Sequence, residues 1–361
     1  MFFTAIIFIL VIGILIFVHE LGHFIMAKKA GMKVEEFSIG FPPRIFKYKK
    51  GETLYSIGAI PFGGFVKILG EDGTHKEDPQ SFASKKAGAR AKVLVAGVAM
   101  NILFAIVLLG IGNISGLRVA VPEEDTQNYR DFQIQISQIA KDSPSEKAGI
   151  NPLDQILGFI NKDGELIEVG SIETIQEVIG QNLDQEIAIV VKRGEERLEK
   201  KIVPRKNPPE GEGAVGLSLV KTGIRDFPWY KALYQGVIQT VYIITATILG
   251  WFTIIKNLVL TGSAGIPISG PIGIAVFTGQ AARIGFLYLL QFTAVISINL
   301  AILNVVPFPA LDGGRLLFIL IEKIKRSPVS QKVEGVVNLI GFALLILLMI
   351  FVTIKDAINF F

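Results

Sequence analysis

The sequence predicts a polytopic α-helical membrane protein with about four transmembrane helices and an inserted extracytoplasmic α+β domain. Half of the 361 residues are hydrophobic and the mean hydropathy is +0.51, which is unusual for a soluble protein of this length. Long apolar stretches alternate with basic segments, and one middle segment shows strand-like alternation instead. The net charge of +4 is the size expected of cytoplasmic loops, so no nucleic acid is expected as a partner.

The first apolar stretch, residues 2–27, is uncharged as far as Phe17 and then reaches His19, Glu20 and His23. At about 1.5 Å per helical residue it is long enough to cross a hydrocarbon core of roughly 30 Å. A secretory signal peptide is the alternative, but the stretch has no basic n-region and no small-residue cleavage site, and its far end is polar. We therefore expect this stretch to span the membrane.

The second apolar stretch, residues 93–113, is preceded by basic residues, and so is the connection between the two stretches. Cytoplasmic connections are enriched in Lys and Arg, so we expect this connection inside and the N-terminus outside. The first predicted domain, residues 1–116, is therefore an N-terminal membrane part that contains a cytoplasmic loop. The basic residues are Lys28, Lys29, Lys33, Arg44, Lys47, Lys49, Lys50, Lys85, Lys86, Arg90 and Lys92.

Residues 117–221 differ in kind from the apolar stretches. Charge returns, and apolar and polar residues alternate from Phe132 to Ile139, which is typical of a half-buried strand. One helix is expected near residues 172–179, and the proline-rich piece 204–209 is expected to be a connector. The segment is thus predicted to be a small α+β domain on the outer side of the membrane.

Three further apolar stretches follow in the third predicted domain, residues 222–361, and a basic segment at 313–333 separates the last two. The basic segment should be cytoplasmic, so an odd number of crossings must separate it from the outer domain. We therefore expect 286–306 to cross, and 229–255 to lie in the interface or re-enter as part of a membrane-associated segment 229–280. Hydropathy alone would predict five crossings, whereas this argument predicts four.

The first stretch carries the pattern H-E-x-x-H, from His19 through Glu20 to His23. The chain has no cysteine and three histidines, so any metal must be held by His, Asp or Glu. Residues i and i+4 share a helix face, so the two imidazoles can converge on one ion, and Glu20 can accept a proton from water that the ion activates. Ionisable groups in a spanning helix usually mark a functional site. The alternative, that all three lie in the headgroup zone, leaves the ligand spacing unexplained.

A catalytic zinc needs a third protein ligand, and Asp312 is the best candidate. It belongs to the segment 304–314, NVVPFPALDGG, which follows the 286–306 stretch. The prolines end the helix and the glycines allow the backbone to approach closely. The expected topology puts Asp312 on the cytoplasmic side, with His19 and His23.

Asp312 has an alternative role as the N-cap of a helix that begins near Arg315. Other acidic groups could compete for the metal. Glu71 and Asp72 are weaker ligand candidates because they lie in a polar loop.

The two motifs together resemble those of the bacterial site-2 protease family, the RseP-like intramembrane zinc metalloproteases. The H-E-x-x-H pattern at 19–23 and the N-x-x-P-x-P-x-x-D-G pattern at 304–313 stand in the family's order, near the expected chain ends. Residues 39–46 and 61–70 resemble the family's first cytoplasmic loop, and residues 269–274 resemble the segment before its third crossing. The resemblance covers nearly the whole chain.

The resemblance implies that His19, His23 and Asp312 bind Zn²⁺ and that Glu20 is the catalytic base. It also implies that Asn304 helps to hold the substrate backbone or the oxyanion. These roles are expectations that come from the family.

The family further implies a re-entrant β-loop at residues 63–70, whose edge pairs with an unwound substrate helix. A helical backbone hides its carbonyl groups and must open before hydrolysis, so an edge that pairs with it is physically sensible. Without the family, an ordinary turn would be preferred for the two glycines. The substrate-binding residues implied here are Gly63, Gly64, Phe65, Val66 and Lys67.

The outer segment resembles a PDZ domain. Residues 143–157 are similar to the stretch between its strands, and residues 216–219 could be the terminal strand of a permuted version. The chain has room for one such domain, whereas some relatives have two. The resemblance makes a peptide tail a candidate partner of this PDZ-like domain, and a fold that only tethers or packs is the alternative.

The expected function is intramembrane proteolysis of single-pass membrane proteins, for example anti-sigma factors. The chain would lie in the lipid bilayer of the bacterial inner membrane, with the active site toward the cytoplasm and the PDZ-like domain outside. A membrane-anchored PDZ scaffold or chaperone is the alternative, and it would tolerate His19→Ala because it needs no zinc. A metal transporter would place ionisable groups along several helices, whereas the candidate ligands here cluster at one depth.

Overall fold

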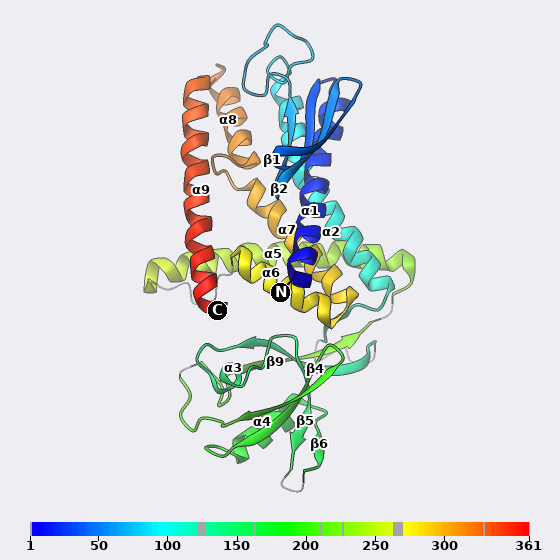
Figure 1. Ribbon diagram of the computed structural model, residues 1–361, viewed down its shortest axis with the longest axis vertical. Coiled ribbons are helices and arrows are strands. Elements are labelled where there is room, and N and C mark those ends of the chain that lie inside the picture. The colour runs from blue at the N-terminus through cyan, green and yellow to red at the C-terminus, as the bar shows by residue number, and fades with distance from the viewer. Residues whose placement is uncertain are drawn as a thin grey trace. The chain divides into compact units, whose positions relative to one another are not determined.

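The computed structural model describes all residues apart from 1, 122–127, 162–163, 210, 226, 263–269, 328 and 361 (Figure 1). The chain divides into two compact units. The first comprises Met1–Ile111, Leu233–Ala282 and Leu289–Phe361, and the second comprises Gly112–Ala232 and Arg283–Tyr288.

The first unit is mainly helical. Within the described residues, five helices, α1, α2, α5, α7 and α9, are long and apolar enough to cross a membrane, by length and composition. A helix suits that role because it satisfies its own backbone hydrogen bonds in lipid. The predicted class, a polytopic membrane protein with a sheet-containing domain, is confirmed at this level. The helices in chain order are α1 (Phe2–Lys29), α2 (Ala87–Ile114), α5 (Trp229–Thr261), α6 (Pro271–Ile284), α7 (Phe286–Val305), α8 (Asp312–Lys325) and α9 (Gln331–Phe360).

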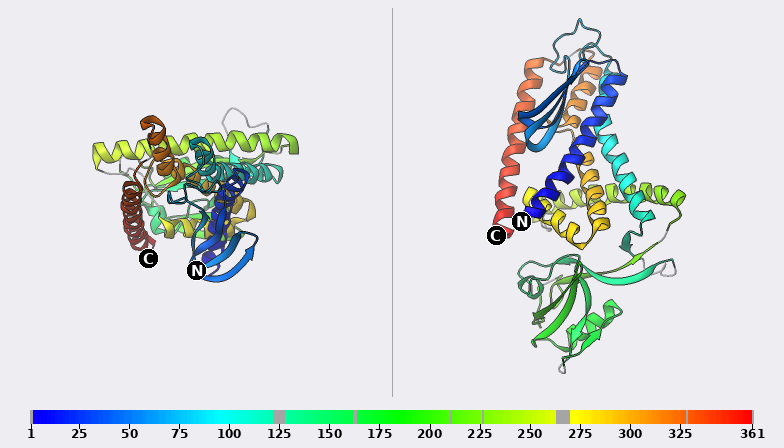
Figure 2. Two further views of the ribbon diagram at one scale, coloured as in Figure 1. Left: turned by 90° about the horizontal axis from the view of Figure 1, so that it is seen from above. Right: turned by 45° about the vertical axis from the view of Figure 1, so that its right-hand side comes forward.

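Helix α5 differs in direction from the other long helices. Its axis lies crosswise to those of α1, α7 and α9 in Figure 1 and in the right-hand view of Figure 2. By length and composition α5 could also span, so the number of crossings stays a prediction. The expected membrane-associated segment 229–280 covers α5 and the start of α6, and its residues 263–269 lie outside the described part of the chain.

Two glycines let α1 and α2 cross closely. A Cβ placed on Gly22 of α1 would collide with the carbonyl oxygen of Ala96 in α2. A Cβ placed on Gly97 of α2 would collide with Nε2 of His23 and lie 2.7 Å from Cε1 of His19. Only glycine therefore allows the two helices to approach at the level of the histidines.

A long hairpin, β1 (Val34–Lys50) and β2 (Thr53–Ile68), follows α1. The chain folds back on itself, because residues 36–39 of β1 pair with 64–67 on one side and with 54–57 on the other. Among the described strand pairs, residues 64–67 pair with β1 alone. The end of β2 is therefore an edge of this sheet, with its second side open to another strand.

One apolar core joins the base of the hairpin to helices α1, α2 and α8. Burial of these side chains fixes the hairpin against the helices, because each residue removed from water favours this packing. The buried members are Ala27, Met32, Val34, Phe37, Val66, Ile68, Phe82, Val93, Leu94 and Ile319.

The second unit is built on a seven-stranded sheet. The strand order is β3-β9-β4-β5-β7-β8, and β6 pairs with β5. The alternating segment lies in β4, as predicted. The strands are β3 (Arg118–Ala120), β4 (Arg130–Ile139), β5 (Gln155–Ile160), β6 (Leu166–Glu168), β7 (Ile187–Arg193), β8 (Glu196–Ile202) and β9 (Leu217–Ile224).

Two helices, α3 (Pro144–Lys147) and α4 (Ile172–Gln181), complete the second unit. The Oγ atom of Ser171 accepts a hydrogen bond from the Thr174 amide and caps α4, which satisfies a free donor of its first turn. Ile175 and Ile179, one turn apart on α4, are buried in the core of the unit. The expected helix near 172–179 is thus present, while the assignment of a PDZ domain stays a prediction.

Candidate active site

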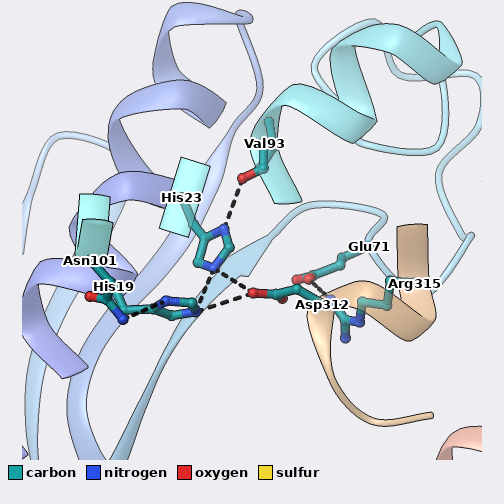
Figure 3. Close-up of polar contacts among 7 residues, drawn as sticks. All are labelled: His19, His23, Glu71, Val93, Asn101, Asp312 and Arg315. Atoms are coloured by element: carbon teal, nitrogen blue, oxygen red, sulfur yellow. Dashed lines mark hydrogen bonds and ion pairs between the residues drawn. The ribbon is translucent and has the colours of Figure 1, made fainter. Parts of the chain in front are cut away.

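His19 and His23 lie one turn apart on α1, and their ring nitrogens converge. Nε2 of His23 lies 3.1 Å from Nε2 of His19. Figure 3 shows that both rings point toward Asp312 of α8. Its Oδ2 atom lies 3.1 Å from Nε2 of His19 and 3.3 Å from Nε2 of His23.

The local sequence explains how Asp312 reaches this point. A Cβ on Gly313 would collide with the carbonyl oxygens of Val305 and Val306, so glycine is needed where α8 folds back against the end of α7. The N-cap of α8 is Leu311, without a side-chain capping bond. The Asp312 carboxylate therefore does not serve as an N-cap and turns toward the histidines.

The three donor atoms fit a zinc ion. Zinc bonds to imidazole nitrogen and carboxylate oxygen of about 2.0–2.1 Å place tetrahedral ligands roughly 3.3 Å apart, and the observed separations are 3.1, 3.1 and 3.3 Å. Burial raises the pKa of the Asp312 carboxyl, but its hydrogen bonds with His19 and His23 hold it well below the usual value. The group is thus ionised, as a metal ligand must be. Among the described residues, His19, His23 and Asp312 are the one group of three found with such spacing.

Helix α2 holds the outer nitrogen of both rings. Nδ1 of His23 lies 2.8 Å from the carbonyl oxygen of Val93, and Nδ1 of His19 lies 3.4 Å from Nδ2 of Asn101. A histidine that binds metal through Nε2 keeps its proton on Nδ1 and needs an acceptor there.

Asn101 can supply that acceptor. The side chain is fully buried, and within the described part of the chain its Oδ1 atom has no hydrogen-bond partner. The O and N atoms of an amide are assigned from the bonds around them, so rotating this amide brings Oδ1 to His19 Nδ1. An orphaned acceptor beside this ring is what a zinc-bound His19 requires.

A cavity of about 350 Å³ opens at these residues. It brings together all the predicted site residues except Gly63, whose Cβ position faces the ring of Phe41. The predicted residues that line the cavity are His19, Glu20, His23, Gly64, Phe65, Val66, Lys67, Asn304 and Asp312.

The edge of β2 approaches the catalytic candidate Glu20 at Gly64. A Cβ on Gly64 would lie 2.8 Å from Cγ2 of Ile16, 2.9 Å from the carbonyl oxygen of Ser38 and 3.1 Å from Cγ of Glu20. Glycine is therefore needed because the strand passes directly over α1, and Glu20 lines the same cavity as the three converging groups and the strand edge.

Sequence reasoning missed several residues of the site. Asn101 is a polar residue in an apolar stretch, four residues after Gly97, and an unexplained polar residue at membrane depth was the available signal. The sequence predicts Glu71 only as a weak metal-ligand candidate. In the structure it forms an ion pair with Arg315 and lines the same cavity.

Known proteins resemble this chain over nearly its full length. The profile of peptidase family M50 matches residues 7–348. A Clostridium acetobutylicum protein whose name assigns it to the zinc metalloproteases is 36% identical over 360 residues, covering 99% of this chain and 98% of that protein. The zinc metalloprotease RasP of Oceanobacillus iheyensis is 32% identical over an alignment of 438 positions, covering 98% of each chain. The regulator of sigma-W protease RasP of Bacillus subtilis is 30% identical over an alignment of 437 positions, again covering 98% of each chain.

Proposed function

The chain belongs to peptidase family M50 and is a zinc metalloprotease of the site-2 protease type, and on that premise we propose that it hydrolyses peptide bonds inside the transmembrane segments of single-pass membrane proteins. One observation carries the proposal. Two imidazoles of the apolar candidate span α1 and a carboxylate of α8 converge at zinc-ligand spacing, beside an open strand edge. The names of the relatives do not favour the scaffold or chaperone alternative.

His19, His23 and Asp312 would hold the zinc. Zinc, when bound, would polarise the scissile carbonyl and make water a better nucleophile at neutral pH. Glu20 would take the proton from the attacking water and return it to the leaving amine, because its side chain lies beside the ligands without being one of them. Asn304 lines the same cavity and would hold the substrate backbone or the developing oxyanion.

The substrate would add a strand to the open edge of β2. Cleavage requires the substrate helix to unwind, and unwound backbone in an apolar setting needs hydrogen-bond partners. Residues 64–67 present a row of backbone groups to the cavity, which supports β-strand addition as the binding mode. Phe65, Val66 and Lys67 line the cavity, and these residues would contact the substrate.

The rest of the architecture follows the same proposal. The membrane parts 1–116 and 222–361 would lie in the bacterial inner membrane with the cavity toward the cytoplasm, and α5 would lie in the interface. The crosswise direction of α5 supports four crossings (Figure 2). The sheet-containing segment 117–221 would be an extracytoplasmic PDZ-like domain that binds a peptide tail, and an anti-sigma factor is the kind of substrate expected.

A reconstituted cleavage assay tests the proposal. Purified wild type and Glu20→Gln would be incubated in liposomes with a single-span substrate, the products would be mapped by mass spectrometry, and zinc would be measured in both. We expect the wild type to cut within the apolar segment and Glu20→Gln to retain zinc without cutting. Cuts confined to the flanking polar segments, or equal cleavage by Glu20→Gln, would overturn the proposal.

A further inference from the structure

Glu71 lies three residues beyond the end of the β2 edge and uses its two carboxylate oxygens on different elements. Oε2 accepts a hydrogen bond from the backbone amide of Ile68 at 3.4 Å. Oε1 pairs with the guanidinium of Arg315 in α8. Figure 3 shows this pair beside Asp312. One side chain thus connects the last residue of the strand to the helix that carries the third candidate ligand.

Arg315 lies three residues after Asp312, so both side chains project from the same face of α8. The far end of α8 is held separately, because Glu322 pairs with Arg90 of α2 at 2.5 Å. The Ile319 side chain between them is buried in the core shared with the hairpin. These three contacts hold α8 against α2 and the hairpin, and of the three Glu71–Arg315 is the nearest in sequence to Asp312.

The position of this pair has a geometric consequence for a strand added to the β2 edge. Because the Ile68 amide already donates to Glu71, pairing with an added strand stops before Ile68. The stretch that stays available, residues 64–67, then has a defined end. That end is joined through Glu71 to Arg315, three positions from Asp312, which ties the position of the strand end to that of the ligand.

We propose that the Glu71–Arg315 ion pair is a positioning device that sets which peptide bond of a bound substrate faces the His19–His23–Asp312 centre. The inference rests on the proposed function, because it assumes a substrate strand on the β2 edge. The pair is partly buried, with 21% of the Glu71 side chain and 40% of the Arg315 side chain exposed. Its location between the strand end and the third candidate ligand carries the inference of a positional role, and the experiment separates that role from a purely structural one.

A double-mutant cycle with product mapping tests the inference. The variants are Glu71→Gln, Arg315→Gln and the double variant, with Asp72→Asn as the matched control. Asp72 precedes Thr74 on the same loop and accepts a hydrogen bond from its amide, and no contact of Asp72 with α8 is found among the described residues. For each variant kcat, KM, zinc content and the cleaved bonds would be measured on a single-span substrate.

We expect Glu71→Gln to keep its zinc but to spread cleavage over neighbouring bonds, with kcat/KM lower by roughly 10- to 100-fold, as a misplacement near 1 Å produces. Arg315→Gln should do the same, and the double variant should be no worse than the worse single variant, because both remove one interaction. Asp72→Asn should cut at the wild-type bond with wild-type kinetics.

Two results would overturn the inference while leaving the proposed function intact. One is an unchanged cleavage bond and unchanged kcat/KM in Glu71→Gln. The other is a loss of activity that matches the loss of folded, zinc-containing protein, with the cleavage bond unchanged, since that is the behaviour of a purely structural ion pair. A wild type that cuts no transmembrane segment would instead overturn the proposed function, and this inference with it.

Discussion

Replacing Gly97 with alanine tests how closely the fit of α2 against the histidines controls the metal centre. The new Cβ would collide with Nε2 of His23 and would lie 2.7 Å from Cε1 of His19 and Cε1 of His23, whereas ordinary contact begins at 3.4 Å. The His19 ring must therefore retreat by roughly 0.7 Å and the His23 ring by roughly 1.0 Å, which is about a third to a half of a zinc–nitrogen bond of about 2.0–2.1 Å. We expect zinc affinity to fall by about 10- to 100-fold or more, the range seen when support of a ligand is lost.

The assay is competition for zinc against a chelator of known affinity, on purified Gly97→Ala and on a matched control. Gly88→Ala is the control, because it lies on the same helix and nothing lies within 4 Å of its Cβ position. Overpacking costs about 1–3 kcal/mol of stability, so thermal unfolding would be followed to confirm that the zinc-free variant is folded. A Gly97→Ala protein that binds zinc within twofold of Gly88→Ala and cuts substrate equally well would refute the reasoning.

Three further outcomes are expected. Asn101→Leu should weaken zinc binding by about tenfold because His19 loses its acceptor, while Asn101→Asp should retain most of the affinity; equal affinity in all three proteins, measured by chelator competition, would contradict this. Gly64→Ala should raise KM or abolish cleavage while zinc content stays at the wild-type level, since its Cβ would lie 2.8 Å from Ile16 and displace the strand edge; an unchanged KM would argue against substrate pairing there. Removing zinc with a chelator should abolish cleavage and restoring it should recover activity, and full activity in the metal-depleted protein would exclude zinc catalysis.

The metal centre could be predicted because two of its ligands stand close together in the sequence, at a spacing typical of metal-binding helices. His19 and His23 stand at i and i+4, and the lack of cysteine restricts the third ligand to His, Asp or Glu. The topology argument then singled out Asp312, and the structure brings its carboxylate to the two imidazoles. The alternative role of Asp312 as an N-cap is wrong, because Leu311 occupies that position.

The supporting residues could not be predicted because their partners are distant in the chain. Asn101 acts on His19 across 82 positions, and Glu71 meets Arg315 across 244. No spacing in the sequence predicts either contact, since each depends on how the helices and the hairpin pack. In the sequence, Gly97 is one small residue within an apolar run. Only the close crossing of α1 and α2 explains why this position has no side chain.

The count of crossings shows a different limit of the sequence. Charge parity predicted four crossings, whereas length and composition admit five helices. Helix α5 separates the two counts, because its composition suits a span while its direction crosses the other long helices (Figure 1). Hydropathy describes how a helix suits lipid, and the orientation of the helix depends on tertiary packing.

The central claim is that His19, His23 and Asp312 hold one zinc ion. Zinc X-ray absorption spectroscopy of the loaded wild type and of Asp312→Ala would test it most directly. We predict a first shell of nitrogen and oxygen at about 2.0–2.1 Å with two imidazoles in the wild type, and the loss of the carboxylate oxygen together with much of the affinity in Asp312→Ala. An identical spectrum and affinity in the two proteins would show that Asp312 is not a ligand and would contradict the account.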